Sequence, residues 1–330
     1  MKKVAIIFTG GTISMKIDER LKAAIPALSD KEIMEKVSGI EKIAETESYH
    51  FGSLPGPHIT PETMLDISKK IREFLDRDDI DGVVLTHGTD TLEETAYFLD
   101  VILDCNKPVV VTGAMRNGSE LGYDGPANLS AAICTVVSKQ SIGRGVLVVF
   151  NNSVYGADEV LKTHTLSLDT FQSMDFGPLG IVDQDEVIYY RGKREIQVVE
   201  TEQIEKKVAL IKSVAGMDSE LIYYYIKEGY KGIVIEAMGR GNVPPRMVAG
   251  IAKAIEKKIP VVIVSRCPKG RVLDSYGYEG GGKGLRSLGA ILGDNLSGPK
   301  ARIKLMIILG KISDVEKVKS LFEKDLYKKV

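Results

Sequence analysis

The chain of 330 residues carries 44 lysines and arginines against 45 aspartates and glutamates, which gives a formal net charge of −1. This balance supplies no positive field to attract nucleic acid or an anionic membrane, so we expect neither as a partner. Three cysteines, an odd number without a CxxC pair, predict reduced thiols and exclude a disulfide framework.

The first apolar run, Val4 to Phe8, follows two lysines and ends in Thr9-Gly10-Gly11. It is too short for the apolar region of a signal peptide, and no small-residue cleavage pattern follows it. No stretch approaches the ~18 apolar residues that a membrane helix needs. We therefore expect a soluble protein in the cytoplasm.

Short apolar runs rich in β-branched residues alternate with segments of helical period. Helices are predicted over Pro61–Leu75, with Thr60 as its N-cap, and over Val248–Ile255. Strands are predicted at Val4–Phe8, Val83–Thr86, Val109–Thr112, Val146–Phe150, Ile233–Glu236 and Val261–Ser265. Continuous apolar strands between amphipathic helices are typical of a parallel sheet covered on both faces. We predict an α/β fold with a doubly wound parallel-sheet N-terminal domain and a second, smaller α/β domain.

The pattern changes near the middle of the chain. Val187–Tyr190 and Ile196–Val199 predict two hairpin strands joined through Arg191–Arg194, and the alternation of strands and helices restarts at Val208. We predict an N-terminal domain over residues 1–190, a connector over 191–207 and a C-terminal domain over 208–330. Asp314–Lys329 predicts a capping helix with a solvated, charged face.

Two loops that follow predicted strands contain the residues best suited to chemistry. One contains Gly11 and Thr12, and the other contains Gly88, Thr89 and Asp90. In an open parallel sheet, ligands bind at the carboxyl ends of the strands. A threonine hydroxyl there can act as a nucleophile if a base or proton relay lies nearby, and glycine backbone lets amide N–H groups approach a substrate. The pattern indicates an enzyme with a hydroxyl nucleophile.

Lys162 is the candidate basic group, because a lysine in a partly dry site can give up its proton and then accept one from a hydroxyl. Each residue alone also has a simpler interpretation. Lys162 fits a surface lysine, Asp90 fits the N-cap of the helix that starts near Thr91, and Gly-Gly-Thr fits a capped turn. His87 and His164 with Asp90 lack the paired spacing of metal ligands, and no dinucleotide or phosphate motif opens a helix. We expect no metal and no cofactor.

The two loops, Thr9-Gly10-Gly11-Thr12-Ile13 and His87-Gly88-Thr89-Asp90-Thr91, resemble the two signatures of bacterial-type L-asparaginases. The absence of a signal peptide and of a cysteine pair resembles the cytoplasmic branch of that family. Further matches in the same order and spacing span nearly the whole chain: Lys162-Thr163-His164-Thr165, Gly177-Pro178-Leu179-Gly180, Gly241-Asn242 and Lys300-Ala301-Arg302. The resemblance implies hydrolysis of L-asparagine to L-aspartate and ammonia without a cofactor.

By the same resemblance, Thr12 is the nucleophile of an acyl-enzyme, and Thr89, Asp90 and Lys162 form a second catalytic group that relays protons. The residues implied in substrate binding are Gly11, Gly56, Pro57, Gly88, Asp90, Ala114 and Asn242. Members of this family form homodimers or homotetramers in which the partner subunit completes each site, and Asn242 matches one such contact.

The chain departs from the family pattern at three places. Gly56 stands where relatives often have a serine, and Ser53 is the nearest hydroxyl. The loop over residues 14–24 has no tyrosine, and the partner-subunit glutamate has no clear match, although Tyr276 or Tyr278 could take its place. These departures bear on the substrate preference and catalytic efficiency more than on the reaction type.

Three alternatives stay open at this point. A glutaminase-leaning variant differs by one methylene in the pocket, which a site discriminates only modestly. An amidotransferase subunit shares the core but usually carries an extra amino-terminal domain, for which the first strand at Val4 leaves no room. A non-catalytic amino-acid sensor could use the same fold, but mere binding does not require Lys162.

Overall fold

The computed structural model describes residues 1–323. The chain divides into two compact units between Glu200 and Thr201. The division falls within residues 191–207. The described part of the chain contains no helix long and apolar enough to cross a membrane.

The first unit, Met1–Glu200, is built on an eight-stranded sheet with the order β12-β11-β8-β7-β6-β5-β1-β4. Strands from β7 to β4 pair in parallel, whereas β8, β11 and β12 are antiparallel additions at one edge. The strands of this sheet are β1 (Lys3–Gly10), β4 (Glu45–Leu54), β5 (Gly82–Thr86), β6 (Val109–Thr112), β7 (Val146–Phe150), β8 (Ser153–Gly156), β11 (Gly180–Asp183) and β12 (Glu186–Tyr189).

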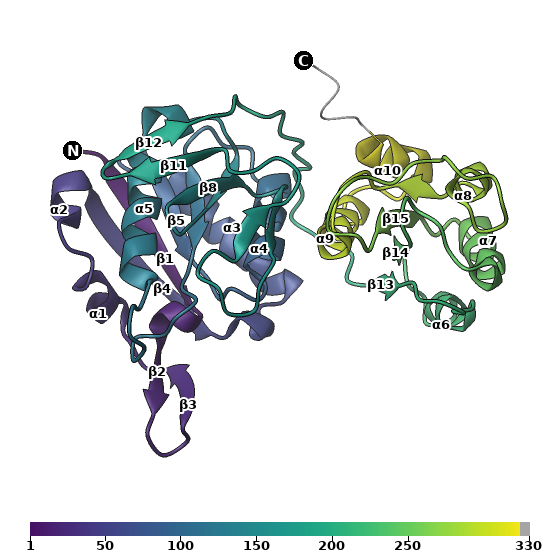
Figure 1. Ribbon diagram of the computed structural model, residues 1–330. Coiled ribbons are helices and arrows are strands. Elements are labelled where there is room, and N and C mark those ends of the chain that lie inside the picture. The colour runs from purple at the N-terminus through teal and green to yellow at the C-terminus, as the bar shows by residue number, and fades with distance from the viewer. Residues whose placement is uncertain (324–330) are drawn as a thin grey trace. The chain divides into compact units, whose positions relative to one another are not determined.

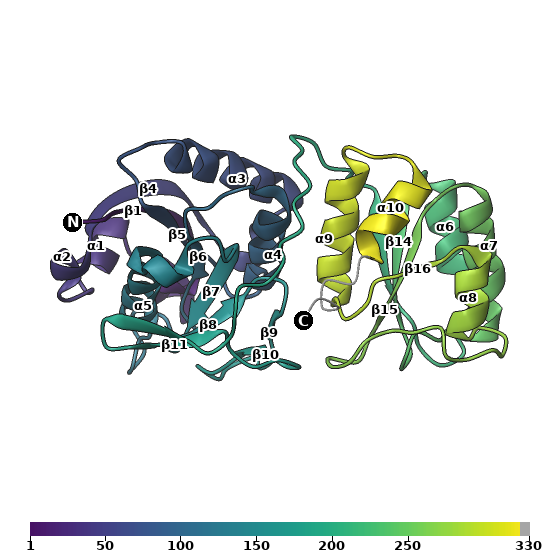
Figure 2. The same cartoon turned by 90° about the horizontal axis from the view of Figure 1, so that it is seen from above.

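Helices cover both faces of this sheet. Helix α5 packs on β5, β6 and β7 from one face with α1 and α2 beside it, and α3 and α4 pack together on the other face (Figures 1 and 2). Their bounds are α1 (Asp30–Met34), α2 (Ile40–Ile43), α3 (Pro61–Leu75), α4 (Leu92–Ile102) and α5 (Gly125–Val137). The central strands are completely buried, which confirms the predicted layering.

Two small hairpins extend from this unit. Strands β2 (Met15–Asp18) and β3 (Ala23–Pro26) pair directly after the 3₁₀ turn Thr12–Ser14, and β9 (Val160–Lys162) pairs with β10 (Phe171–Ser173). The ring of Phe171 lies 4.5 Å, centroid to centroid, from that of Phe150 at the end of β7. This contact anchors the second hairpin to the sheet.

The second unit has a parallel four-stranded sheet of order β13-β14-β15-β16. Helices α6, α7 and α8 lie on one face, and α9 with α10 on the other (Figure 2). The bounds are β13 (Val208–Lys212), α6 (Glu220–Lys227), β14 (Gly232–Ala237), α7 (Val248–Glu256), β15 (Val261–Ser265), α8 (Gly282–Leu288), β16 (Ile291–Leu292), α9 (Gly298–Leu309) and α10 (Val315–Phe322). The two units thus confirm the predicted α/β class.

The predicted terminal helix is present as α10, whose N-cap Asp314 accepts a hydrogen bond from the Lys317 backbone N–H at 2.9 Å. The part of the prediction after Glu323 lies outside the described residues.

The predicted hairpin between Val187–Tyr190 and Ile196–Val199 is wrong. β12 pairs with the preceding strand β11, and residues 191–199 have no regular structure. Arg194 instead reaches into the unit, 2.6 Å from Asp100 and 3.2 Å from Asp158. A buried guanidinium needs such partners. Because Asp100 and Asp158 lie on other segments, these ion pairs hold residues 191–199 away from β12.

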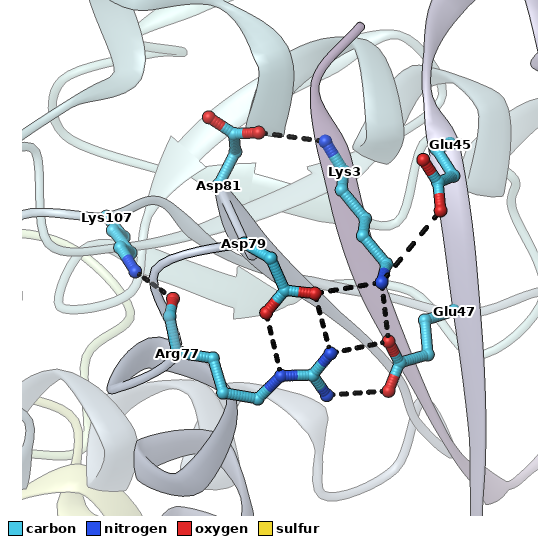
Figure 3. Close-up of polar contacts among 7 residues, drawn as sticks. All are labelled: Lys3, Glu45, Glu47, Arg77, Asp79, Asp81 and Lys107. Carbon is cyan, nitrogen blue, oxygen red and sulfur yellow. Dashed lines mark hydrogen bonds and ion pairs between the residues drawn. The ribbon is translucent and has the colours of Figure 1, made fainter.

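Charged side chains gather at the amino ends of β1, β4 and β5 (Figure 3). The loops with Thr12 and Thr89 follow the carboxyl ends of β1 and β5, at the opposite edge of the sheet. Arg77 donates to both carboxylate oxygens of Glu47 at 2.7 and 2.8 Å, and it also bonds Asp79. Lys3 Nζ lies 2.9 Å from Asp79 and 3.1 Å from Glu47. The hydrogen bonds from Arg77, followed by those from Lys3, lower the pKa of Glu47 to about 2 and lower that of Asp79 as well.

The network therefore predicts a pH-dependent contribution of Glu47 to stability. A carboxylate with a depressed folded-state pKa stabilises the fold above its unfolded pKa of ~4.3, and the contribution is lost as the pH falls toward about 2. We expect Glu47→Gln to lower the Tm at pH 7 and low salt by a few degrees at most, because these side chains are partly solvated. The Tm difference from wild type should shrink between about pH 4.5 and 2.

The matched control is Glu35→Gln, which removes an exposed carboxylate 3.9 Å from Lys31. Thermal denaturation from pH 2 to 8 should show no comparable pH dependence for the control. A Tm difference for Glu47→Gln that stays constant over this range would contradict the assignment.

Candidate active site

Three loops at the carboxyl ends of neighbouring strands meet backbone to backbone. Gly11 follows β1 with φ +83°, and a Cβ added there would lie 2.5 Å from the Cα of Gly88, which follows β5. A Cβ on Gly88 would lie 2.6 Å from the Cα of Gly56, in the 3₁₀ turn after β4. No side chain fits at either contact, so glycine is what allows the three loops to approach. The loops that carry Thr12, Gly56 and Thr89 are thereby adjacent.

His87 fixes the peptide of Gly88 from within the core. Its Nδ1 lies 2.8 Å from the Gly88 carbonyl oxygen, and its Nε2 lies 2.9 Å from the Thr95 hydroxyl on α4. Burial lowers the pKa of His87 to about 4, so the ring is neutral at pH 7. Because the carbonyl oxygen only accepts, Nδ1 carries the proton and Nε2 accepts from Thr95. Sequence reasoning considered His87 only as a metal ligand and missed this role.

Thr89, Asp90 and Lys162 form a hydroxyl–amine–carboxylate group. The Lys162 Nζ donates to Thr89 Oγ1 at 2.8 Å and to Asp90 Oδ1 at 2.7 Å. Thr89 is buried and the Lys162 side chain is 17% exposed, whereas that of Asp90 is 59% exposed. The amine thus contacts a dry hydroxyl on one side and a solvated carboxylate on the other. The lysine is therefore not a surface residue, and Asp90 does not cap α4, whose N-cap is Thr91.

The hairpin β9–β10 brings Lys162 to this position from 72 residues away in the sequence. Lys162 is the last residue of β9 and pairs with the anchored Phe171 of β10. Its backbone N–H also donates to the carboxylate of Glu93 on α4. Glu93 was not among the residues predicted from the sequence, and only the fold brings it to the lysine.

Thr12 lies in the turn that follows Gly11 and is half-buried. The Gly11 carbonyl accepts hydrogen bonds from the backbone N–H and the hydroxyl of Ser14 at 3.0 and 2.9 Å, which closes the turn around Thr12. Through the contact of Gly11 with Gly88, this turn adjoins the loop of Thr89 and Asp90.

The other predicted binding residues divide between the two units. Gly56 is buried against Asp90, and its carbonyl accepts a hydrogen bond from Thr91 at 2.7 Å, whereas Pro57 beside it is exposed. Ala114 is buried after β6, where the neighbouring Gly113 packs against the His87 carbonyl. Asn242 belongs to the second unit, and its side chain accepts from Gly282 N–H at 3.3 Å.

The two histidines considered as metal ligands, His87 and His164, have other partners within the fold. His87 uses both ring nitrogens within the fold, and His164 Nδ1 accepts from the N–H groups of Leu166 and Ser167 at 3.0 Å. Among residues 1–323, no group of three or more His, Cys, Asp and Glu side chains is placed to hold a metal.

The parallel sheet, with glycine-lined loops at the carboxyl ends of its strands and the Thr89–Lys162–Asp90 group beside them, has the architecture of an α/β enzyme. Residues 3–195 match the model of the asparaginase N-terminal domain, and residues 207–322 match that of the glutaminase/asparaginase C-terminal domain. The chain belongs to the asparaginase family.

Three relatives illustrate this membership. An L-asparaginase of Bacillus licheniformis is 38% identical, with 93% of this chain and 95% of the relative covered. A glutamyl-tRNA(Gln) amidotransferase subunit of Methanosarcina mazei is 30% identical over 99% of this chain and 78% of the relative. The crystal structure of a probable cytoplasmic L-asparaginase from Campylobacter jejuni superposes with a TM-score of 0.88 and 32% identity, covering 98% of this chain and 99% of that one.

Proposed function

We propose that this protein hydrolyses L-asparagine to L-aspartate and ammonia, with Thr12 as the nucleophile. The observation that carries the proposal is the hydrogen bonding of Lys162 Nζ to both Thr89 Oγ1 and Asp90 Oδ1, in a loop whose Gly88 adjoins the Thr12 turn. Binding alone does not require a lysine held against a buried hydroxyl. Such a contact instead suits proton transfer to and from a reacting group.

The reaction divides into two steps. The Thr12 Oγ attacks the side-chain amide carbon of asparagine, the C–N bond breaks, and the hydroxyl proton passes to the leaving ammonia. Water then adds to the resulting ester, and aspartate leaves with the Thr12 hydroxyl restored. Thr89 and Lys162 provide the hydrogen-bonded path for these protons, and the Asp90 carboxylate binds the substrate's α-amino group. Backbone at Gly11, Gly88 and Ala114 lines the amide end of the site.

Backbone groups are also the proposed binders of the substrate α-carboxylate. Ser53 is exposed near the end of β4, and Gly56 lies directly against Asp90 and Gly88. The turn at Gly56 and Pro57 therefore brings its backbone close to Asp90, and neither residue carries a hydroxyl side chain.

The proposal extends to assembly and location. We propose that residues 1–190 and 208–330 form the two domains with 191–207 as connector, and that homodimers or homotetramers form in which Asn242 of one subunit completes a neighbouring site. A cytoplasmic location is supported by the similarity to the probable cytoplasmic enzyme of Campylobacter jejuni.

The test is release of ammonia from L-asparagine and from L-glutamine by the full chain. We expect turnover of asparagine and slower turnover of glutamine, because one methylene in a pocket changes the rate by about 10- to 200-fold. Faster turnover of glutamine would replace the proposed substrate. No release from either amide, with L-aspartate still raising the Tm, would instead identify an amino-acid sensor.

A further inference from the structure

The turn that carries Thr12 is held by a residue far away in the sequence. The hydroxyl of Tyr123 donates a hydrogen bond to the carbonyl oxygen of Ile13, the residue directly after Thr12. These residues are 110 positions apart. The hydrogen bond from Ser14 to the Gly11 carbonyl thus closes the Thr12–Ser14 turn, and the hydrogen bond from Tyr123 holds the middle residue of the turn.

Tyr123 itself is firmly placed. Its ring packs against a hydrophobic core cluster of the first unit, and a Cβ on Gly125 would lie 2.6 Å from it. Burial, reinforced by the charge of the neighbouring Asp124, raises the pKa of the Tyr123 hydroxyl. The hydroxyl therefore keeps its proton and remains a donor at neutral pH.

The loop from Met115 to Asp124 that carries this tyrosine is cross-linked by its own hydrogen bonds. The Asp124 carboxylate accepts hydrogen bonds from the backbone N–H groups of Met115 and Arg116 and from the side-chain amide of Asn128, at 2.9 to 3.1 Å. Glu120 accepts from the backbone N–H of Asn117 at 2.8 Å. A loop closed in this way can fix the position of what it contacts.

The same loop also holds the hairpin that follows Thr12. Gly118 N–H donates to the Met15 carbonyl at 2.8 Å, and Ile17 N–H donates to the Ser119 hydroxyl at 3.0 Å. Together with the bond from Tyr123, these contacts join residues 13–17 to residues 118–123 at three points. The backbone directly after Thr12 is therefore positioned from the loop after β6.

We propose that Tyr123 is a positioning residue that sets the orientation of Thr12 by holding the carbonyl of Ile13. This inference rests on the proposed role of Thr12 as nucleophile. A nucleophile must lie close to its attack geometry, and a misplacement of about 1 Å costs on the order of 10²-fold in rate. Tyr123 acts through the Ile13 carbonyl, so its effect should be on kcat and leave binding intact.

The test is Tyr123→Phe, which keeps the buried ring and removes the donor. We expect kcat for asparagine to fall by about 10-fold, with KM and the Kd for L-aspartate changed by less than about 2-fold. The matched control is Tyr189→Phe. Tyr189 also packs against this core cluster, and its hydroxyl lies 2.7 Å from that of Ser141, away from the Thr12 turn. The control should leave kcat unchanged.

Steady-state kinetics and thermal denaturation of both variants separate the possible outcomes. Equal kcat for wild type, Tyr123→Phe and Tyr189→Phe overturns the inference while leaving the proposed function intact. Equal losses in both variants, or a raised KM at unchanged kcat, show that the tyrosine is only structural and also overturn it. Absence of asparagine turnover in the wild type overturns the proposed function itself, before either variant is compared.

Discussion

Replacing Thr12 by alanine is expected to lower kcat for L-asparagine by at least about 10⁴-fold, the scale of loss when an enzyme's nucleophile is removed. The alanine leaves no oxygen at this position to form the proposed ester. Thr12 is half-buried in a turn closed by hydrogen bonds from the Ser14 N–H and hydroxyl to the Gly11 carbonyl, so the fold should survive the change. Ammonia release at saturating asparagine measures the effect, and the Kd for L-aspartate should change little.

Two further variants make this result specific. Thr12→Ser keeps a hydroxyl at the position and should retain turnover well above that of the alanine variant. Thr135→Ala removes another hydroxyl in the same unit, one that bonds the Ala131 carbonyl within α5 at 2.8 Å, and it should leave kcat unchanged. Turnover by Thr12→Ala within 10-fold of the wild-type rate would mean that another residue is the nucleophile.

The sequence predicted the structure best where the propensity of a segment for helix or strand agrees with its place in the fold. The predicted strands Val109–Thr112 and Val146–Phe150 and the helix Pro61–Leu75 have the same bounds in the structure. In the helix, the Thr60 side chain accepts from the Thr63 N–H, and Pro61 at the first position needs no donor of its own. Since parallel strands end at one edge of the sheet, correct strand ends also placed the loops of Thr12 and Thr89 together.

Prediction failed where a distant partner decides the local structure. Residues 196–199 alternate like a strand, but Arg194 is drawn to Asp100 and Asp158, and Val199 N–H donates to the Val101 carbonyl. No local pattern encodes partners so far away in the sequence.

The same limit applies to three residues around the site. The bonds of Tyr123 to Ile13, Glu93 to Lys162 and His87 to Thr95 span 110, 69 and 8 positions. Only the last lies within reach of a sequence pattern, because Thr95 faces the core from the first turns of α4.

Replacing Lys162 by methionine is expected to lower kcat by about 10³-fold, within the range that general acid–base groups contribute. Methionine fills a similar volume but cannot donate to Thr89 or carry a proton. The backbone N–H of residue 162 still donates to Glu93, and the β9–β10 pairing does not depend on the side chain, so the hairpin should remain in place. Stopped-time ammonia assays at saturating asparagine measure the loss.

The matched control is Lys69→Met on α3, which removes an amine 3.0 Å from Asp66 in an exposed ion pair and should not change kcat. The Kd of the Lys162 variant for L-aspartate decides how the lysine acts. An affinity within a few-fold of wild type, with kcat strongly reduced, means that Lys162 serves the chemical step, as the short contact with the buried Thr89 hydroxyl indicates. If affinity and kcat/KM fall by the same factor while kcat is retained, Lys162 only holds Asp90 in position for binding. The Thr89–Lys162–Asp90 group would then be a substrate clamp, and the protons would have to move through Thr12 and bound water alone.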